Sequence, residues 1–351
     1  MKIVHYCHQL GLGGTEKCMQ YLLEYLHGAG HDCYCIHNRA KTEAAGGYRE
    51  GVIKNIVGAG KVFGHTSEAE FFEIMASIRA EIFHVHRSGR PSEFPIVPEL
   101  RRFGAKCVET NVFGGYDPTD VIDLTLYVSD YLYKRAQKPR RRTAVLYNPV
   151  KEPATRDNLR AALQIPETTF VMGRIGRPDD HIFDPISLHA LNRIESKGAS
   201  DILYLVQSPP PRMVETATIL GLKKIRFILE PIISDEDVSR FFNTIDVLAH
   251  MGRVGETFGL SIAEAMIHGK PVISHRSRAA NGHETFVKRC GFFARRDDDR
   301  QYARFIRILY EDEKRRQQLG ESGRGFAVMH FNLSKIGSEL EGYYEQVLSE
   351  R

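Results

Sequence analysis

The sequence lacks several features that would place it in a specialised class of protein. No apolar run reaches the roughly 20 residues that a membrane-spanning helix requires, so a helical membrane protein is excluded. The six cysteines form no Cys-x-x-Cys pair and no spacing typical of zinc sites. Most of them lie in apolar segments, as reduced cysteines commonly do. We therefore expect a cytoplasmic protein without a secretory signal and without a zinc site.

A strong charge of one sign is also absent. Lysine and arginine total 48 against 44 aspartate and glutamate residues, which gives a formal net charge of +4. This balance is too small for a nucleic-acid binder, and no basic stripe is interleaved with aromatic residues. The segment Tyr131–Arg142 is locally basic. Two interpretations of it stay open: a solvated helix end, or contact with an anionic acceptor or with lipid headgroups at the inner membrane surface.

Strand-like and helix-like segments alternate along all 351 residues, a length that favours two domains over one. The alternation predicts an α/β fold with parallel sheets covered on both faces. The first series of predicted strands comprises Lys2–Tyr6, Asp32–Ile36, Ile82–His86, Ala105–Glu109, Thr125–Ser129 and Thr143–Leu146. The second comprises Phe170–Ile175, Ile202–Val206, Ile225–Leu229, Asp246–Ala249 and Pro271–Ser274.

The segment Asn148–Pro153 separates the two series. Its two prolines interrupt both strand pairing and helix formation. We therefore expect one domain over residues 1–150 and a second over 151–331. A final helix over 332–351 is predicted from an apolar stripe formed by Ile336, Leu340, Tyr343, Tyr344 and Val347.

A glycine loop, Gly11–Thr15, follows the first predicted strand and opens a helix. Gly13 and Gly14 would let the backbone approach a ligand, and the helix N-terminus would present N–H groups to an anion. Thr15 is the predicted N-cap. A dinucleotide fingerprint would need a third glycine where Glu16 stands, so a dehydrogenase is disfavoured. A tight turn without a ligand is the open alternative.

Two glutamates, Glu256 and Glu264, follow the predicted strand Asp246–Ala249 with seven residues between them. We expect the backbone N–H groups of Phe258, Gly259 and Leu260 to start a helix and to face an anion such as a diphosphate. Glu256 would then face a sugar ring. Glu264 would accept hydrogen bonds from vicinal hydroxyls, as on a ribose. The alternative is that both acids are ordinary surface charges.

The two-glutamate segment resembles the Glu-x7-Glu signature of retaining glycosyltransferases of family 4, the glycosyl transferases group 1, which have the GT-B fold. Further resemblances follow in the family's order: the glycine loop, Ile82–His86, Val145–Val150, Ile175–Arg177 and Asn281–Glu284. The resemblance implies two Rossmann-like domains whose parallel sheets face a central cleft. It also implies an acceptor-side first domain, a donor-binding second domain, and a C-terminal helix that crosses back to the first.

Members of this family move a sugar from a nucleoside-diphosphate sugar to an acceptor hydroxyl and keep the anomeric configuration, usually without a metal or other cofactor. By resemblance, Glu264 would hold the donor ribose and Glu256 the donor sugar. Phe258, Gly259 and Leu260 would bind phosphate, Arg177 would neutralise the diphosphate, and His86 would orient the transferred sugar. We expect His84 to be a buried packing residue on the opposite face of its strand.

The acceptor is expected to be a glycan, a lipid-linked or a small molecule, in glycan, glycolipid or polysaccharide synthesis. No Asp-x-Asp stands in a suitable phosphate loop, so no metal is expected.

One position departs from the family pattern. The family usually has a lysine five residues after the arginine that matches Arg177, and Ile182 stands there. Asp179 and Asp180 add negative charge nearby, and His181, Arg253 or Lys270 are the candidates to compensate. Two alternative functions follow: a catalytically impaired nucleotide-sugar-binding protein, and a nucleotide-sugar epimerase on the same scaffold.

Overall fold

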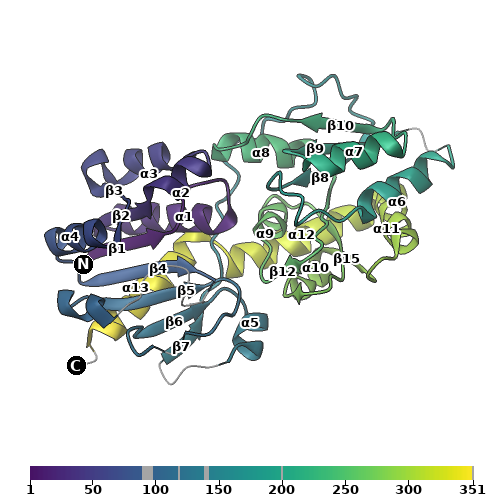
Figure 1. The fold of residues 1–351 in the computed structure, drawn as a ribbon. Coiled ribbons are helices and arrows are strands. Elements are labelled where there is room, and N and C mark those ends of the chain that lie inside the picture. Colours follow the sequence, from purple (N-terminus) through teal and green to yellow (C-terminus); the bar gives the residue numbers. More distant parts are fainter. Residues whose placement is uncertain (89–97, 118, 138–141, 199–200, 350–351) are drawn as a thin grey trace. The chain divides into compact units, whose positions relative to one another are not determined.

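The computed structural model describes residues 1–88, 98–117, 119–137, 142–198 and 201–349, and it contains two α/β units (Figure 1). Unit 1 comprises Met1–Pro149 together with Phe331–Arg351, and unit 2 comprises Val150–His330. The chain thus passes from one unit to the other at the proline-bounded turn and returns at Phe331.

Unit 1 contains a seven-stranded parallel sheet in the order β3-β2-β1-β4-β5-β6-β7. Its strands are β1 Lys2–Cys7, β2 Asp32–Asn38, β3 Val62–His65, β4 Ile82–Arg87, β5 Lys106–Asn111, β6 Leu124–Tyr127 and β7 Arg142–Val145. Its helices are α1 Gly14–Gly28, α2 Arg39–Ala44, α3 Glu50–Val57, α4 Glu68–Ile78, α5 Asp130–Arg135 and α13 Leu333–Ser349. Short 3-10 helices span Ala59–Lys61 and Pro98–Phe103.

Unit 2 contains a six-stranded parallel sheet in the order β10-β9-β8-β11-β13-β15, beside a two-stranded pair, β12 and β14. The strands are β8 Phe170–Ile175, β9 Ile202–Gln207, β10 Ile225–Ile228, β11 Val247–Ala249, β12 Gly255–Glu256, β13 Val272–His275, β14 Ala280–Asn281 and β15 Gly291–Ala294. The helices are α6 Ile186–Glu195, α7 Pro211–Ile219, α8 Asp235–Thr244, α9 Leu260–Ile267, α10 Glu284–Cys290, α11 Asp299–Glu311 and α12 Glu313–His330.

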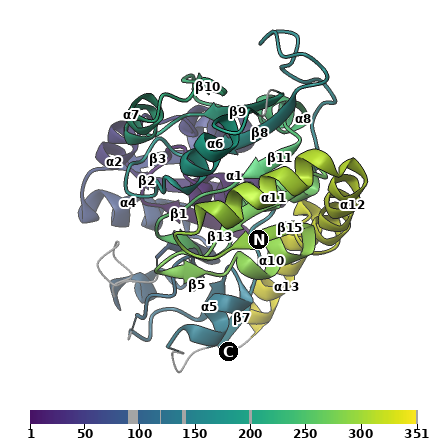
Figure 2. The ribbon, with the colours of Figure 1, turned by 90° about the vertical axis from the view of Figure 1, so that its right-hand side faces the viewer.

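Helices cover both sheets because the strands carry apolar side chains on both faces. In unit 2, apolar residues of α6, α7 and α11 form one buried cluster with β8, β9 and β11, and Figure 2 shows α6 and α11 side by side. The strands β3 and β15 were not predicted, since both are short and rich in glycine or aromatic residues. Among the described helices, none is both long and apolar enough to cross a bilayer.

Both sheets reverse their direction of growth beside their first strand. In unit 1 the chain moves outward from β1 to β3 and then returns to place β4 next to β1. In unit 2 it moves outward from β8 to β10 and returns to place β11 next to β8. Such a switch point leaves a crevice at the carboxyl ends of the two central strands, where open α/β sheets bind ligands. The topology therefore indicates where each unit's functional residues should lie.

The basic segment Tyr131–Arg142 lies in unit 1 and is only partly described. Lys134 and Arg135 occupy the last turn of α5, and the Arg135 guanidinium lies 5.1 Å from the centre of the Tyr131 ring. Lys138, Arg140 and Arg141 lie outside the described residues.

The last helix, α13, packs on unit 1. Ile336, Leu340, Tyr344 and Val347 are all at most 1% exposed and share one core cluster with residues of α1 and β1. The Tyr25 hydroxyl of α1 donates to Glu341 on α13 at 2.8 Å. Gly337 faces the Tyr25 ring so closely that an added Cβ would lie 2.3 Å from the ring carbons. The end of the chain is therefore an integral part of the first unit's core.

We predict that Gly337→Ala destabilises the protein by about 1–3 kcal/mol, because the ring of Tyr25 lies in the space that the methyl group needs. Gly342→Ala on the same helix is the matched control, since nothing lies within 4 Å of its added Cβ. That control should be neutral or stabilising by about 0.5–1 kcal/mol. Urea denaturation of both variants measures the difference; equal midpoints would contradict the packing of α13 against α1.

Candidate functional site

Arg177 and Glu256 lie at the switch point of unit 2. Arg177 follows the carboxyl end of β8, and Glu256 follows β11, the strand that pairs with β8 in the sheet. The positive charge of Arg177 is one of the influences on the pKa of Glu256. The crevice predicted by topology thus has a cation on one side and a carboxylate on the other.

Glu256 is an ionised carboxylate held beside a histidine. Its side chain is 40% exposed, and Oε1 lies 3.6 Å from Nε2 of His250. Desolvation raises the pKa of Glu256, but the hydrogen bond with His250 and the positive charge of Arg177 outweigh it and lower the pKa overall. A carboxylate in this state accepts hydrogen bonds and does not serve as a proton donor.

Three polar side chains, His283, Ser274 and His250, form a ring of contacts with the Glu256 backbone and carboxylate. Burial lowers the pKa of His283 to about 3, so its ring is neutral. Its Nδ1 lies 3.4 Å from the Glu256 carbonyl oxygen. Its Nε2 lies 3.2 Å from the Ser274 hydroxyl, which in turn lies 2.9 Å from Nδ1 of His250.

Through these contacts, Nε2 of His250 is directed at the carboxylate of Glu256. The sequence analysis did not predict this ring. His283 was noticed only as part of Asn281–Glu284, and His250 and Ser274 were not noticed at all. The available signal was their position, since His250 follows β11 and Ser274 is near the end of the neighbouring strand β13. Polar residues at the carboxyl ends of adjacent central strands converge on the crevice.

The turn between Glu256 and α9 is shaped by close backbone approaches. Gly259 is the N-cap of α9 with φ of 90°, a left-handed conformation that favours glycine. Phe258 is buried, and its ring lies 5.4 Å from that of Phe286. A Cβ at Gly282 would lie 2.1 Å from the Thr257 carbonyl oxygen, which fixes β14 against this turn. The helix starts at Leu260, and the sequence segment Phe258–Leu260 leads directly into its N-terminus.

Glu264 lies on the second turn of α9 and is only 7% exposed. The interpretation of Glu264 as an ordinary surface charge is therefore wrong. A carboxylate is seldom retained at such burial without a partner. Glu256, by contrast, keeps access to solvent and to a ligand.

The loop after Arg177 is ordered by its own acidic residues. Arg177 is 49% exposed on its side chain, with Nη2 at 3.9 Å from Asp179. Asp179 accepts the backbone N–H of His181 at 2.9 Å, and Asp180 accepts that of Arg212 at the start of α7, also at 2.9 Å. These carboxylates therefore stabilise the turn and the helix end in addition to adding negative charge.

Ile182 is half-buried in this loop, and its carbonyl oxygen accepts the backbone N–H of Arg253 at 3.0 Å. The exposed Arg253 therefore belongs to the same edge of the sheet and stays a candidate to compensate for the missing lysine. Lys270, by contrast, is not a candidate. It precedes β13, and Asp246 precedes β11. Burial lowers the pKa of Lys270, and the nearby charge of Asp246 raises it by a smaller amount. Both residues lie at the amino ends of the parallel strands, opposite the crevice.

Arg174 is a further cation that sequence reasoning missed. It is 4% exposed near the end of β8, and burial lowers its pKa to about 10, so it stays charged at neutral pH. Its guanidinium donates to the carbonyl oxygens of Arg177, Gln207 and Ser208 at 2.9, 3.2 and 2.7 Å. Arg174 therefore fixes the backbone that carries Arg177.

The glycine loop of unit 1 packs against the side chain of Glu16 at the start of α1. Helix α1 starts at Gly14 with Gly13 as its N-cap, so the prediction of Thr15 as the cap was wrong. Glu16 folds back over the helix start: its carboxylate accepts from Gln9 at 2.9 Å, and Oε2 would lie 2.1 Å from a Cβ at Gly13. A carboxylate here is favoured by the positive end of the helix dipole. A side chain at position 13 would therefore displace the carboxylate of Glu16 from the helix start.

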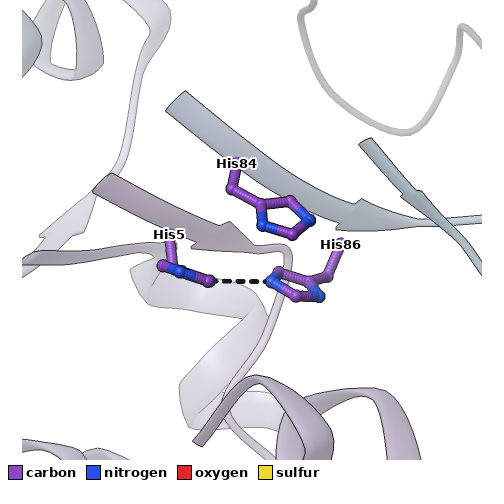
Figure 3. A group of neighbouring side chains, drawn as sticks. All are labelled: His5, His84 and His86. Carbon is purple, nitrogen blue, oxygen red and sulfur yellow. Dashed lines mark hydrogen bonds between the residues drawn. The ribbon is translucent and has the colours of Figure 1, made fainter. Parts of the chain in front are cut away.

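Three histidines meet beside the switch point of unit 1 (Figure 3). His5 of β1 and His84 of β4 are fully buried, and His86 is 3% exposed. The ring centres of His84 and His86 lie 4.4 Å apart, so the expectation that they face opposite sides of β4 was wrong. Side chains alternate along a strand, and residues two apart share a face. Burial lowers the pKa of all three, that of His86 to about 3, so all are neutral.

These histidines also offer three nitrogens within 4.8 Å of one another, a set that a transition-metal ion is able to use. In this structure the nitrogens have other partners. His5 hydrogen-bonds through Nδ1 to His86 and through Nε2 to Tyr344, and His84 bonds Tyr344 and Thr110 through its two nitrogens. Both nitrogens of His5 and of His84 are satisfied by protein groups, which favours a hydrogen-bonded chain over a metal site.

Comparisons with known proteins identify a matching family model within unit 2. Residues 211–326 match the family model described as glycosyl transferases group 1. This range includes β11, Glu256, Glu264, α9 and the ring around His250. No curated protein matches the chain in sequence.

Solved glycosyltransferases share the fold of the whole chain. A glycosyltransferase from Rickettsia africae has a TM-score of 0.79 at 15% identity, covering 100% of this chain and 99% of its own. Alr3699/HepE from Anabaena in complex with UDP has a TM-score of 0.76 at 17% identity, covering 99% and 100%. Sucrose-phosphate synthase from Thermosynechococcus elongatus has 0.75 at 16%, covering 100% of both chains. Residues 211–326 thus match the family model of the glycosyl transferases group 1, and the chain as a whole has the GT-B fold.

Proposed function

We propose that this protein is a retaining glycosyltransferase that moves a sugar from a nucleoside-diphosphate sugar to an acceptor hydroxyl. One observation carries the proposal: Arg177, ionised Glu256 and the uncapped start of α9 converge at the switch point of unit 2, largely within the matched family segment. The Anabaena protein of the same fold was solved with UDP and with UDP-glucose, which supports a nucleotide-sugar donor.

Each residue of unit 2 has a distinct role in this proposal. The backbone N–H groups of Phe258, Gly259 and Leu260 bind the diphosphate at the positive end of α9. Arg177 neutralises charge on the leaving diphosphate, and Glu264 accepts hydrogen bonds from the donor ribose. Glu256 holds hydroxyls of the transferred sugar. Stabilisation of the leaving group and positioning supply most of the rate enhancement.

Unit 1 takes the acceptor side in this proposal. His86 orients the transferred sugar, and Gly13 and Gly14 of the glycine loop bind the donor through the backbone at the start of α1. The acceptor is a glycan, a lipid-linked or a small molecule, and the basic segment from Tyr131 is the candidate contact for an anionic acceptor or an inner membrane surface. The reaction is proposed to take place in the cytoplasm and to need no metal or other cofactor, because helix N-termini and Arg177 supply the positive charge.

A second candidate is a protein that binds the nucleotide sugar without transferring it. Ile182 favours this alternative, because it provides no cation where the family usually has lysine. The deciding experiment has two stages. A thermal-shift screen of UDP, GDP, ADP and their sugars identifies the nucleotide, and release of labelled sugar from that donor is then followed with and without EDTA.

Binding with turnover that survives EDTA supports a metal-independent transferase. Binding without turnover or donor hydrolysis supports the second candidate. Loss of turnover in EDTA, restored by magnesium or manganese, would contradict metal independence. Appearance of an epimer of the donor without acceptor would identify an epimerase instead.

We predict that Glu264→Ala weakens binding of the identified nucleoside diphosphate by about 1.5–3 kcal/mol, because ribose hydroxyls lose a charged acceptor. Isothermal titration measures the change. Since Glu264 is 7% exposed, Glu264→Gln is tested beside it as a variant that keeps the side-chain volume. Equal nucleotide affinity in the wild type and both folded variants would remove Glu264 from the site.

We predict that Arg177→Ala lowers turnover roughly a hundredfold or more, on the scale of losing one donor to a developing negative charge. Its side chain is 49% exposed, so the fold should not depend on it. Arg307→Ala on α11 is the matched control, being 48% exposed and also paired with a carboxylate. If the two variants have the same kcat, Arg177 is not part of the mechanism.

We predict that Ile182→Lys raises either turnover or nucleoside-diphosphate affinity, because it restores a cation beside the leaving group. The position is only half-buried, so the longer side chain has access to solvent. Melting temperature and donor kinetics are measured together. A lower melting temperature with no kinetic gain would show that Ile182 is needed for packing in the loop.

A further inference from the structure

The hydroxyl of Tyr344 joins two of the buried histidines of unit 1. It lies 2.6 Å from Nδ1 of His84 and 3.3 Å from Nε2 of His5. His5 continues through Nδ1 to Nε2 of His86 at 2.9 Å, and His84 continues through Nε2 to the Thr110 hydroxyl at 2.8 Å. The result is one chain of four hydrogen bonds that runs from Thr110 through His84, Tyr344 and His5 to His86.

When the Tyr344 hydroxyl donates within this chain, the proton count permits only two arrangements. A neutral imidazole donates with one nitrogen and accepts with the other, and a phenol hydroxyl donates one hydrogen bond. If Tyr344 donates to His84, then His5 donates to Tyr344, His86 donates to His5, and His84 donates to Thr110. If Tyr344 donates to His5, every bond is reversed. The tautomers of the three histidines are therefore set together, and one group cannot reverse alone.

The surroundings favour neutral rings and a fixed geometry. Burial lowers the pKa of His5, His84 and His86, which removes the doubly protonated forms that would break the sequence of donors and acceptors. Tyr344 is fully buried, and its apolar neighbours on α13 anchor it in the core of unit 1. Because these groups are excluded from water, an unmade hydrogen bond within the chain is costly.

We propose that Tyr344 of the C-terminal helix is a positioning residue that fixes the tautomer and ring orientation of His86 through His5. The inference rests on the proposed function for the sugar-facing role of His86, but the hydrogen-bonded chain itself does not. The direction in which Tyr344 donates is thereby coupled to whether Nδ1, the second nitrogen of His86, is presented to a sugar hydroxyl as a donor or as an acceptor. A merely structural helix would hold unit 1 together without affecting that nitrogen.

The test compares Tyr344→Phe with Tyr343→Phe, its neighbour on the same helix. The first variant removes the hydroxyl from the chain and keeps the ring, whereas Tyr343 is only partly buried against the core. Imidazole ¹⁵N chemical shifts of the full-length protein report the tautomers of His5, His84 and His86. Donor kinetics report kcat and KM separately. Thr110→Val is a second variant that interrupts the chain at its far end without altering α13.

We expect Tyr344→Phe and Thr110→Val to shift or broaden the ¹⁵N signals of His86, while Tyr343→Phe leaves them unchanged. The kcat of Tyr344→Phe should fall about tenfold or more, with the affinity for the nucleoside diphosphate unchanged. Unchanged His86 signals in both chain variants would overturn the inference. Altered His86 signals in a protein that turns over no donor would leave the chain established and count against the proposed transferase activity instead.

Discussion

The reversal of strand order beside the first strand of each sheet determines where the proposed site residues of each unit lie. Parallel strands with helices on both faces bury their side chains, and only the carboxyl edge at the reversal stays open to a ligand. In unit 2 this edge brings Arg177 from β8 together with Glu256 and the start of α9 from beyond β11. In unit 1 it brings the glycine loop after β1 near the end of β4, the strand that carries His86.

Each of these edges has a supporting layer of buried polar groups that fixes the groups facing the crevice. Arg174 holds the carbonyl oxygen of Arg177, and the ring of His250, Ser274 and His283 holds both the backbone and the carboxylate of Glu256. Such layers have a common physical basis: a buried donor or acceptor must be paired, and pairing it restricts its neighbours to one geometry. Preorganisation of this kind is what a site that stabilises a leaving diphosphate needs.

The sequence predicted the layers of the fold well, because strands buried on both faces read as continuous apolar runs and helices as periodic ones. Strand β8 is an example, since its predicted and observed bounds, Phe170–Ile175, coincide. The failures have local causes. Thr15 was mistaken for a cap because the contact between Glu16 and the helix start is three-dimensional. The ring around His250 joins residues from three separate segments, and no spacing along the chain reveals it.

The buried neutral histidines have a consequence for the environment in which this fold persists. Unfolded histidine binds its proton near pH 6.5, whereas burial lowers the pKa of His86 and His283 to about 3. Between those values the unfolded chain binds more protons than the folded one, so the free energy of unfolding falls as the pH falls. Each such histidine contributes a loss of about 1.4 kcal/mol per pH unit. With His5 and His84 shifted in the same direction, acidification below about pH 6.5 destabilises both units together.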